Sequence, residues 1–482
     1  MPAPLKRPVR AGDRVRLHAL LSKGVQQVRV VRRALALLQL DRGGGASAAA
    51  RAVGLSPGAV RLMRVAARSC LARVAIALTV TACGAAESKT SMKALTDSVL
   101  ASPAERLQVA VDTLATGLEV PWGLAQAPDG RIFVTERAGR IRVLSDGKLD
   151  PAAWATLAVH SSYLDWGPES GLLGIALSPS FAENRHVFVM ATATMSERPS
   201  GSLAGRMLRR LARTVSSRAA PLPVKSQIIR LSDRDGRGVD PVVIIDNLPA
   251  NHYHAGGGLT FGPDGKLYAS VGDVTRPELA PSARSLADKV LRFNADGSIP
   301  ADNPDPASAV WASGLRNTQA FLWLPDGTML GVEHGPTGMP QEGSRAGEDE
   351  LNLLSQGADY GWPSVTGWQV SATSRRPIWV WNHGLAPAGM TLWESSSSGD
   401  TATILVGGLH RRLERLRLVR GQLGDWRVTA GDTLLGPKWG RIRTLMILRD
   451  GSALVTTSNR DARGQPGPGD DLLLRLSLER AR

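Results

Sequence analysis

A short pattern of polar turn residues followed by an apolar strand recurs along the chain from about residue 106 onward. In each copy a Pro or Asp combined with Gly precedes β-branched and aromatic residues on alternating faces, which predicts a tight turn leading into a β-strand. The copies are APDGRIFVTE from Ala127, SPSFAENRHVFVMAT from Ser178, GPDGKLYASVGD from Gly262, LPDGTMLGVEHGP from Leu324, RDGSALVTTSN from Arg449 and a weaker match, TATILVGGLHRRLERLRL, from Thr401.

This repetition favours an all-β fold, a six-bladed β-propeller over residues 106–482. The copies are separated by roughly 50 to 80 residues without a strong amphipathic helix between them, which is typical of blades of four antiparallel strands. Six such blades need about 350 to 380 residues, which this stretch supplies. A pair of β-sandwiches is the alternative, but sandwiches do not repeat one turn and strand so often.

The first hundred residues differ in composition. Residues 1–95 contain 17 Lys and Arg against three acids, a net charge of +14 out of the formal +15, so the rest has 41 basic and 40 acidic residues. The high isoelectric point therefore indicates no nucleic-acid partner for the propeller. The segment ASAAARAVGLSPGAVRLMR, from Ala46, nevertheless resembles a helix-turn-helix.

A second pattern, beginning at Met63, conflicts with a DNA-binding role. A basic start, an apolar run and the tetrapeptide VTAC ending at Cys83 are typical of a bacterial lipoprotein signal; a short buried helix is the alternative. Lipidated Cys83 would tether an exported, periplasmic or membrane-anchored propeller to a membrane surface. We therefore predict a helical or disordered extension outside the mature protein (1–62), a signal segment (63–83), a linker (84–105) and the propeller (106–482).

The first candidate site is NHYHAGGG, from Asn251. If this segment is a strand, His252 and His254 share a face, and a neutral imidazole there could accept a proton from an alcohol. The glycines that follow would let a planar ligand approach the backbone. A structural role for the histidines is the alternative.

Two further segments carry arginines. Arg316 and Asn317 lie together in a predicted loop without acidic residues nearby in sequence, and such a pair suits carboxylates and carbonyls; an interblade salt bridge is the alternative. Arg441 and Arg443 point to the same face of one predicted strand. On a channel face they predict an anionic ligand, whereas on a solvent face they predict nothing.

A fourth segment offers oxygen ligands. The carbonyls of Gly335 and Pro336, in VEHGP, precede Asp349 and Glu350, in GEDELN. These are the hard oxygen ligands that calcium takes, although acidic loop residues are often only solvated.

Taken in order, these segments resemble the glucose/sorbosone dehydrogenase family, the soluble quinoprotein sugar dehydrogenases. The resemblance runs from about Leu118 to the C-terminus and includes ESGLLGIALSPSFAENRHVFV, HAGGGLTFGPDGKLY, SGLRNTQA, EHGP, DELNLL and DYGWP. It implies a propeller that binds pyrroloquinoline quinone (PQQ) and Ca²⁺ at the channel mouth and oxidises the anomeric carbon of an aldose sugar to the lactone.

The resemblance also implies roles for single residues. His254 would be the catalytic base, the carbonyls of Gly335 and Pro336 would bind the calcium of the cofactor, and Asp349, Glu350 and Tyr360 would surround a second, structural calcium. Trp381 would form an aromatic wall over the ring. The cofactor would be held by Arg316, Asn317, Arg441 and Arg443, with Glu169 and His410 at cofactor-contacting positions.

Three positions depart from the family pattern: Gly258 stands where the family usually has Arg, His410 where glucose-type enzymes have Lys, and Glu169 where they have Gln. These changes leave open a propeller that has lost the quinone and acts as a carbohydrate-binding or interaction module. A calcium-dependent lactonase is a further alternative. Neither the particular sugar nor the electron acceptor follows from the sequence.

Overall fold

The computed structural model describes residues 107–161, 169–195, 224–339, 342, 346–369, 371–422 and 424–480. The chain divides into two compact units, Met1–Ser88 and Lys89–Arg482, and all described residues belong to the second. The predicted extension, the signal segment with Cys83 and the linker lie outside the described residues. Among the residues described, no helix has the length and apolarity needed to cross a membrane.

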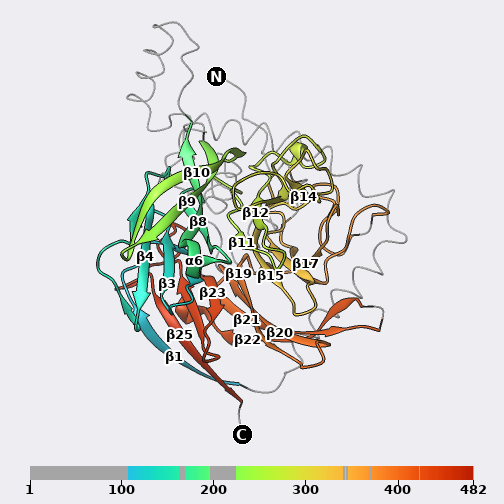
Figure 1. Cartoon of the computed structure of the whole chain (residues 1–482). Helices are drawn as coiled ribbons and strands as arrows, with labels where there is room; N and C mark the ends of the chain where they lie inside the picture. Colours follow the sequence, from blue (N-terminus) through green and yellow to red (C-terminus); the bar gives the residue numbers. More distant parts are fainter. Residues whose placement is uncertain are drawn as a thin grey trace, which may run out of the picture. The chain divides into compact units, whose positions relative to one another are not determined.

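Six antiparallel sheets form the described structure (Figure 1). Five have four strands, the first has β6 as a fifth, and β1 completes the last. The predicted six-bladed propeller is therefore confirmed. In the first three blades the strands are β2 (Pro121–Gln126), β3 (Ile132–Glu136), β4 (Arg140–Ser145) and β5 (Lys148–Leu149), with β6 (Ala155–Thr156) beside β4; β7 (Leu172–Leu177), β8 (His186–Thr194), β9 (Val224–Arg234) and β10 (Arg237–Pro249); and β11 (Leu259–Phe261), β12 (Leu267–Val271), β13 (Lys289–Phe293) and β14 (Val310–Ser313).

The remaining blades follow in chain order. Their strands are β15 (Thr318–Trp323), β16 (Met329–Glu333), β17 (Asp349–Leu354) and β18 (Trp379–Trp381); β19 (Pro387–Ser395), β20 (Thr401–Gly408), β21 (Arg412–Arg420) and β22 (Trp426–Leu435); and β23 (Ile442–Ile447), β24 (Ala453–Thr457), β25 (Leu473–Arg480) and β1 (Leu107–Ala115). The short helices are α6 (Phe181–Asn184), η1 (Pro277–Leu279) and η3 (Pro437–Trp439).

The ring closes by pairing the two ends of the propeller. Strand β1, blue in Figure 1, is the outermost strand of the last blade and runs antiparallel to the red β25. The innermost strands of neighbouring blades contact one another all the way round, and β2 meets both β7 and β23. Because the edge of each innermost strand faces the axis, the loops at its ends converge there.

Each repeated sequence motif forms the turn between the first and second strands of one blade. In four blades the Asp of the motif accepts a hydrogen bond from the backbone N–H two residues later, and the following Gly has a positive φ of 71° to 92°. Only glycine adopts this conformation without strain. The fifth blade has Ser and Gly in this turn instead, which explains its weaker match.

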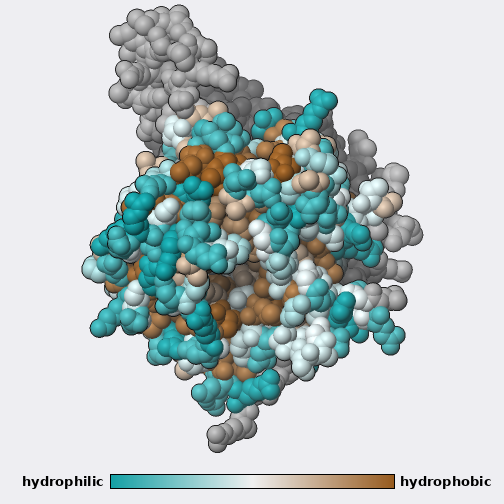
Figure 2. Space-filling view, viewed as in Figure 1, coloured by the Kyte–Doolittle hydropathy of each residue, from teal (hydrophilic) through white to brown (hydrophobic). Residues whose placement is uncertain are grey.

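Apolar residues fill the space between every pair of neighbouring blades. The second strands β3, β12, β16 and β24 are buried at every position, since they pack against another blade on both faces. Six separate clusters result, one for each blade interface. The described residues on the face shown in Figure 2 are mostly hydrophilic with scattered hydrophobic patches. Exposed large apolar side chains among the described residues include Val242 and Val243 of the edge strand β10.

Candidate functional site

The candidate residues gather at one end of the propeller axis, where innermost strands begin and second strands end. The loop with His254 leads into β11, Arg316 and Asn317 lead into β15, and Arg441 immediately precedes β23. The chain leaves β12 at Asp273 and β16 at His334 on the same side. The topology thus brings together segments that lie far apart in the sequence.

His254 is buried and hydrogen-bonded on both ring nitrogens. Its Nδ1 lies 2.6 Å from Asp273 Oδ1, and its Nε2 lies 3.0 Å from Arg316 Nη2. A guanidinium group can only donate, so Nε2 is the acceptor and Nδ1 carries the proton that is donated to Asp273. This hydrogen-bond pattern selects the tautomer that has its lone pair on Nε2, as a general base requires; in this structure the lone pair accepts from Arg316.

The condition for a shared histidine face is not met, because the segment from Asn251 to Gly258 is a loop rather than a strand. His254 adopts a left-handed φ of 54°. Its backbone N–H donates to Glu169 Oε2 at 2.7 Å. His252 points elsewhere, with its ring edge-on to His160 at 5.3 Å, so the two histidines do not act as a pair.

Asp273 and a neighbouring glycine fix the base in position. Asp273 Oδ1 also accepts from the Thr275 backbone N–H at 2.9 Å, and Oδ2 accepts from Trp362 Nε1 at 3.1 Å. Gly272 is required because a Cβ there would lie 2.2 Å from the His254 carbonyl oxygen. The sequence analysis did not single out Asp273, although it ends the third copy of the repeat.

Arg316 is held by a buried acid that sequence proximity did not indicate. Glu342 Oε1 accepts from Arg316 Nε at 2.7 Å, and both side chains are almost fully buried. Glu342 Oε2 in turn accepts from the Thr337 backbone N–H at 2.9 Å. Burial makes this ion pair rigid, and it holds the guanidinium against His254.

Asn317 has a buried donor without a partner. Its Oδ1 accepts from the Gly256 backbone N–H at 3.1 Å, but its Nδ2 has no hydrogen-bond partner among the described residues. An unpaired buried amide costs free energy, and a ligand carbonyl or carboxylate would satisfy it.

Arg441 and Arg443 of the last blade share one carboxylate partner. Arg441 Nε and Arg443 Nη2 both lie against Asp461 Oδ2, at 2.7 and 3.2 Å. Arg443 also stacks over Trp122 with its Cζ 4.1 Å from the ring centroid. Burial lowers the pKa of Arg443 to about 10, with the charge of Asp461 opposing the shift. Both arginines therefore remain charged near neutral pH.

Glu169 reaches the site from the loop before β7 and is paired. Its Oε1 accepts from Arg463 Nη1 at 3.0 Å across a separation of 294 residues. Burial by itself would raise the pKa of Glu169, but the charges of Arg463 and other nearby groups bring it well below its usual range. The carboxylate therefore stays ionised.

Cations outnumber anions in this part of the site. Arg137, Arg443 and Arg463 line a small cavity with Glu169 and Asp461, and Arg441 binds the same Asp461. A second small cavity lies between Arg316, Gly335 and Trp362. His334 lines both cavities, and burial lowers the pKa of its ring to about 4, so it is neutral there. The excess positive charge favours an anionic ligand.

The predicted calcium ligands surround the second cavity only in part. Gly335 and Pro336 line it, and the Pro336 carbonyl also accepts from the Gly347 N–H at 2.8 Å. Asp349 has both oxygens occupied by backbone donors: Gly335 N–H at 2.8 Å, and Leu385 and Ala386 N–H at 2.6 Å each. In this structure Asp349 therefore connects two blades.

Glu350 and Tyr360 lie together at the second cavity, beside another buried acid. Glu350 faces Glu333 across β16 and β17, and both accept from Asn352 Nδ2. Burial raises the pKa of Glu350 to about 7, and it also raises the pKa of Glu333 above its usual range. Glu333 Oε2 has no partner among the described residues. Two adjacent buried carboxyl groups favour a shared proton or a bound cation, although no cluster of three or more His, Cys, Asp or Glu suited to a metal occurs in the described part of the chain.

Two predicted cofactor contacts lie away from the cavities. Trp381 is buried in the core between the fourth and fifth blades, where its Nε1 donates to Glu414 Oε2 at 2.7 Å. It cannot form the predicted aromatic wall, and Trp122 and Trp362 line the cavities instead. His410 is exposed in the turn after β20, with its Nδ1 3.2 Å from the Gly384 carbonyl; its neighbour Leu409 lines the first cavity.

Sequence reasoning also missed several residues of the site: Arg137, Asp273, His334, Glu342, Asp461 and Arg463. A usable signal was present for some of them. Arg137, Asp273 and His334 each lie within two residues of the end of a blade's second strand, and Asp461 follows β24 by a few residues. The end of each repeat therefore marks the site more reliably than residue type does.

The fold and these contacts define a β-propeller with a histidine–aspartate pair and a cationic pocket at one end of its axis. The model of the glucose/sorbosone dehydrogenase family matches residues 118–474, and the chain belongs to this family. The resemblance found in the sequence is thereby confirmed.

Individual relatives agree with this assignment. An uncharacterised protein from Synechocystis is 34% identical over 357 residues, covering 67% of this chain and 79% of that protein. The crystal structure of a putative glucose dehydrogenase from Thermus thermophilus has a TM-score of 0.64 at 36% identity, covering 77% of this chain and all of that one. The PQQ-bound aldose sugar dehydrogenase of Streptomyces coelicolor has a TM-score of 0.62 at 27% identity, covering 78% and 100%. These relatives support a sugar-dehydrogenase-like oxidoreductase.

Proposed function

We propose that this protein is a PQQ-dependent aldose sugar dehydrogenase that oxidises the anomeric C–H and O–H of the sugar to the lactone. The observation that carries the proposal is His254, whose Nε2 lone pair is oriented by the Asp273 contact at Nδ1 and faces the guanidinium of Arg316. The family assignment and the PQQ-bound relative support the choice of cofactor.

The residues present fit a planar, anionic quinone. Arg441 and Arg443 would hold its carboxylates, and the unpaired Nδ2 of Asn317 would donate to one of its oxygens. The two cavities have volumes of only about 10 Å³ each, room for roughly one water molecule. Binding therefore requires side chains that line them to rotate; Arg463, whose side chain is 39% exposed, lines the first cavity and could do so by breaking its ion pair with Glu169.

When bound, PQQ would supply the hydride acceptor and calcium, held by the Gly335 and Pro336 carbonyls, would act as a Lewis acid. The chain itself handles the proton. His254 Nε2 would take the hydroxyl proton of the sugar, and the Asp273 carboxylate at Nδ1 would stabilise the resulting imidazolium. Arg316 would have to release Nε2 as the substrate enters, and its pairing with Glu342 gives it a stable alternative partner.

The test is reconstitution of the purified protein with PQQ and Ca²⁺, followed by dye reduction with a panel of aldoses. We expect turnover with some aldoses, and we expect His254→Ala to abolish it while PQQ binding, measured by absorbance titration, is retained. His252→Ala is the matched control, since this buried histidine lies two residues away and its ring packs edge-on to His160. Absence of PQQ binding by the wild type would overturn the proposal and favour a cofactor-free carbohydrate-binding module.

We also propose export and attachment to a membrane through lipidated Cys83, on the strength of the VTAC pattern. Radiolabelled palmitate should enter the full chain expressed in a bacterial host, and Cys83→Ser should prevent this. Labelling that persists in the variant would contradict the proposal.

A further inference from the structure

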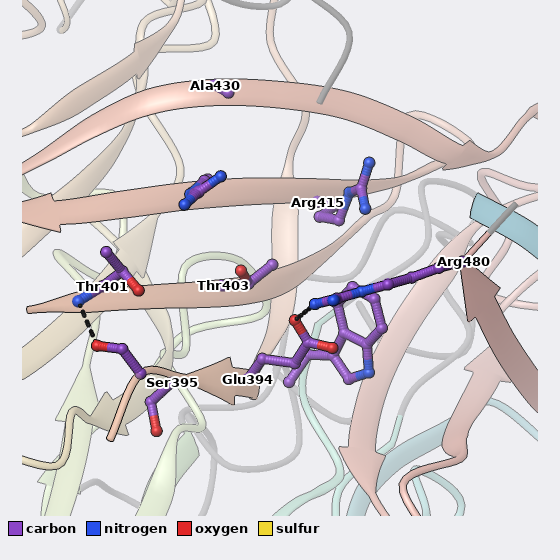
Figure 3. Close-up of a pocket in the computed structure, with 10 residues that line it drawn as sticks. Glu394, Ser395, Thr401, Thr403, Arg415, Ala430 and Arg480 are labelled. Carbon is purple, nitrogen blue, oxygen red and sulfur yellow. Dashed lines mark hydrogen bonds and ion pairs between the residues drawn. The ribbon is translucent and has the colours of Figure 1, made fainter. Parts of the chain in front are cut away.

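A cavity away from the candidate site lies at the opposite end of the blades. It has a volume of about 350 Å³, within the roughly 300 to 1,000 Å³ typical of small-molecule sites. Its lining comes from all four strands of the fifth blade and from the end of β25 in the sixth (Figure 3). The turn between β19 and β20 is at this end, whereas His254 and Arg443 are at the other.

Two neighbouring rows of side chains on the fifth blade explain why the cavity exists. Leu405, Arg415 and Asp432 are cross-strand partners on β20, β21 and β22, and so are Thr403, Arg417 and Ala430, two residues along each strand. Cross-strand partners project from the same face. Leu405 packs in the core between the fifth and sixth blades, so both rows face the sixth blade.

The first row neutralises its own charge. Asp432 binds Arg415 through both oxygens, at 2.7 and 2.9 Å. In the second row Ala430 stands where the acid would be, so the same space is open. Arg417 has no side-chain hydrogen bond or ion pair with any described residue. The third arginine of the cavity, Arg480, pairs with Glu394 at 3.3 Å, as the dashed line in Figure 3 shows.

The other lining residues suit a hydroxylated ligand. The hydroxyls of Thr401 and Thr403 make no hydrogen bond to a described residue, and Ser395 adds a third hydroxyl at the rim. Trp393 contributes a partly exposed indole on which the C–H face of a sugar ring could pack. The volume far exceeds that of an inorganic anion.

We propose that this groove between the fifth and sixth blades binds a sugar carrying one oxyanion, a carboxylate or a phosphate. The oxyanion binds Arg417 in the same way that the carboxylate of Asp432 binds Arg415. The hydroxyls of the sugar form hydrogen bonds with Thr401 and Thr403. The inference is independent of the proposed dehydrogenase activity, because it concerns a separate surface and is tested without cofactor.

The test is calorimetric titration of the full chain with gluconate and with glucose 6-phosphate, which separate a carboxylate from a phosphate source. We expect at least one to bind, and Arg417→Ala to weaken that binding by about tenfold or more, the loss of one charge-assisted hydrogen bond. Ala430→Asp should have the same effect, because it supplies an internal carboxylate opposite Arg417. Arg427→Ala, an exposed arginine of β22 outside the cavity, should bind like the wild type.

Several outcomes would overturn the inference. The first is that neither sugar anion binds. The second is that the wild type, Arg417→Ala and Ala430→Asp bind the sugar anion equally well. The third is that neutral glucose or inorganic phosphate binds as tightly as the sugar anion. Binding in the cationic pocket at the other end would survive both substitutions, so it cannot be mistaken for binding in the groove.

Discussion

Replacement of Asp273 by Asn tests whether a negative charge beside His254 is needed for proton transfer. Asp273 accepts three hydrogen bonds, from His254, Thr275 and Trp362, whereas Asn has one acceptor oxygen. With that oxygen toward His254 and Thr275, only the Trp362 bond is lost. The reverse orientation loses the Thr275 bond and forces His254 into the wrong tautomer, with an N–H facing Arg316. The first orientation is therefore favoured, and the histidine tautomer is retained.

What the substitution removes is the charge that stabilises the imidazolium. Charge centres about 4 Å apart interact with about 4 kcal/mol at an effective dielectric constant near 20, which corresponds to nearly three powers of ten in rate. The dipole of the Asn amide supplies part of the lost electrostatic stabilisation of the imidazolium. We therefore expect kcat/KM to fall by about 10²- to 10³-fold. PQQ affinity should be unchanged, because Asp273 is not among the residues expected to hold the cofactor.

The assay is dye reduction by the reconstituted enzyme, with PQQ affinity measured separately. Asp326→Asn is a closely matched control: Asp326 accepts from a backbone N–H, that of Thr328, at 2.9 Å and from an indole N–H, that of Trp426, at 3.0 Å, but from no histidine. Its kcat/KM should equal that of the wild type. If Asp273→Asn retained activity within about threefold, Asp273 would have no electrostatic role in proton transfer.

Three further predictions concern stability. Calcium should raise the melting temperature of the wild type above its value in the presence of a chelator, and Glu350→Gln should remove most of that increase. If calcium raised the melting temperatures of the wild type and of the variant equally, Glu350 would be excluded as a calcium ligand. Burial raises the pKa of Asp471 from 3.8 to about 6, so the folded state holds this proton more tightly and the free energy of unfolding should fall by about 3 kcal/mol as the pH rises through this interval. Urea unfolding of wild type and Asp471→Asn at both ends of the interval should show this loss only in the wild type. Trp381→Phe should lower the free energy of unfolding by about 1 to 3 kcal/mol, because Glu414 loses its buried donor, while the affinity for PQQ stays constant; weakened PQQ binding would restore Trp381 to the cofactor site.

The fold was predictable because its signals are local. The hydrogen bond from the N–H of Lys266 to Asp264 and the positive φ of Gly265 involve a few consecutive residues. Such a turn forms wherever the sequence PDG precedes a strand, whatever the rest of the chain does. The apolar second strands then required burial on both faces, which a ring of blades provides.

The candidate site was predictable only in its residue types. His254 and Arg316 were identified from the sequence, but Asp273 was not recognised as the partner of His254, and Arg441 and Arg443 were considered without their shared acid. Trp381 shows the opposite error, since a tryptophan near the matching motif was assigned to the cofactor site although the core between two blades buries it. In each case the deciding contact came from a different segment of the chain.

The sequence by itself therefore determined the six repeated turns, the strands that follow them and the presence of a base and arginines suited to an anionic cofactor. Only the tertiary structure decided which acid meets each base: Asp273 with His254, Glu342 with Arg316, Asp461 with two arginines, and Arg463 with Glu169. The reason is that turn formation depends on hydrogen bonds between near neighbours, whereas these buried charges are paired over separations of 18 to 294 residues. The first three sets come together when the strands of one blade pair, and Arg463 meets Glu169 only when the ring of blades closes, which no short stretch of sequence encodes.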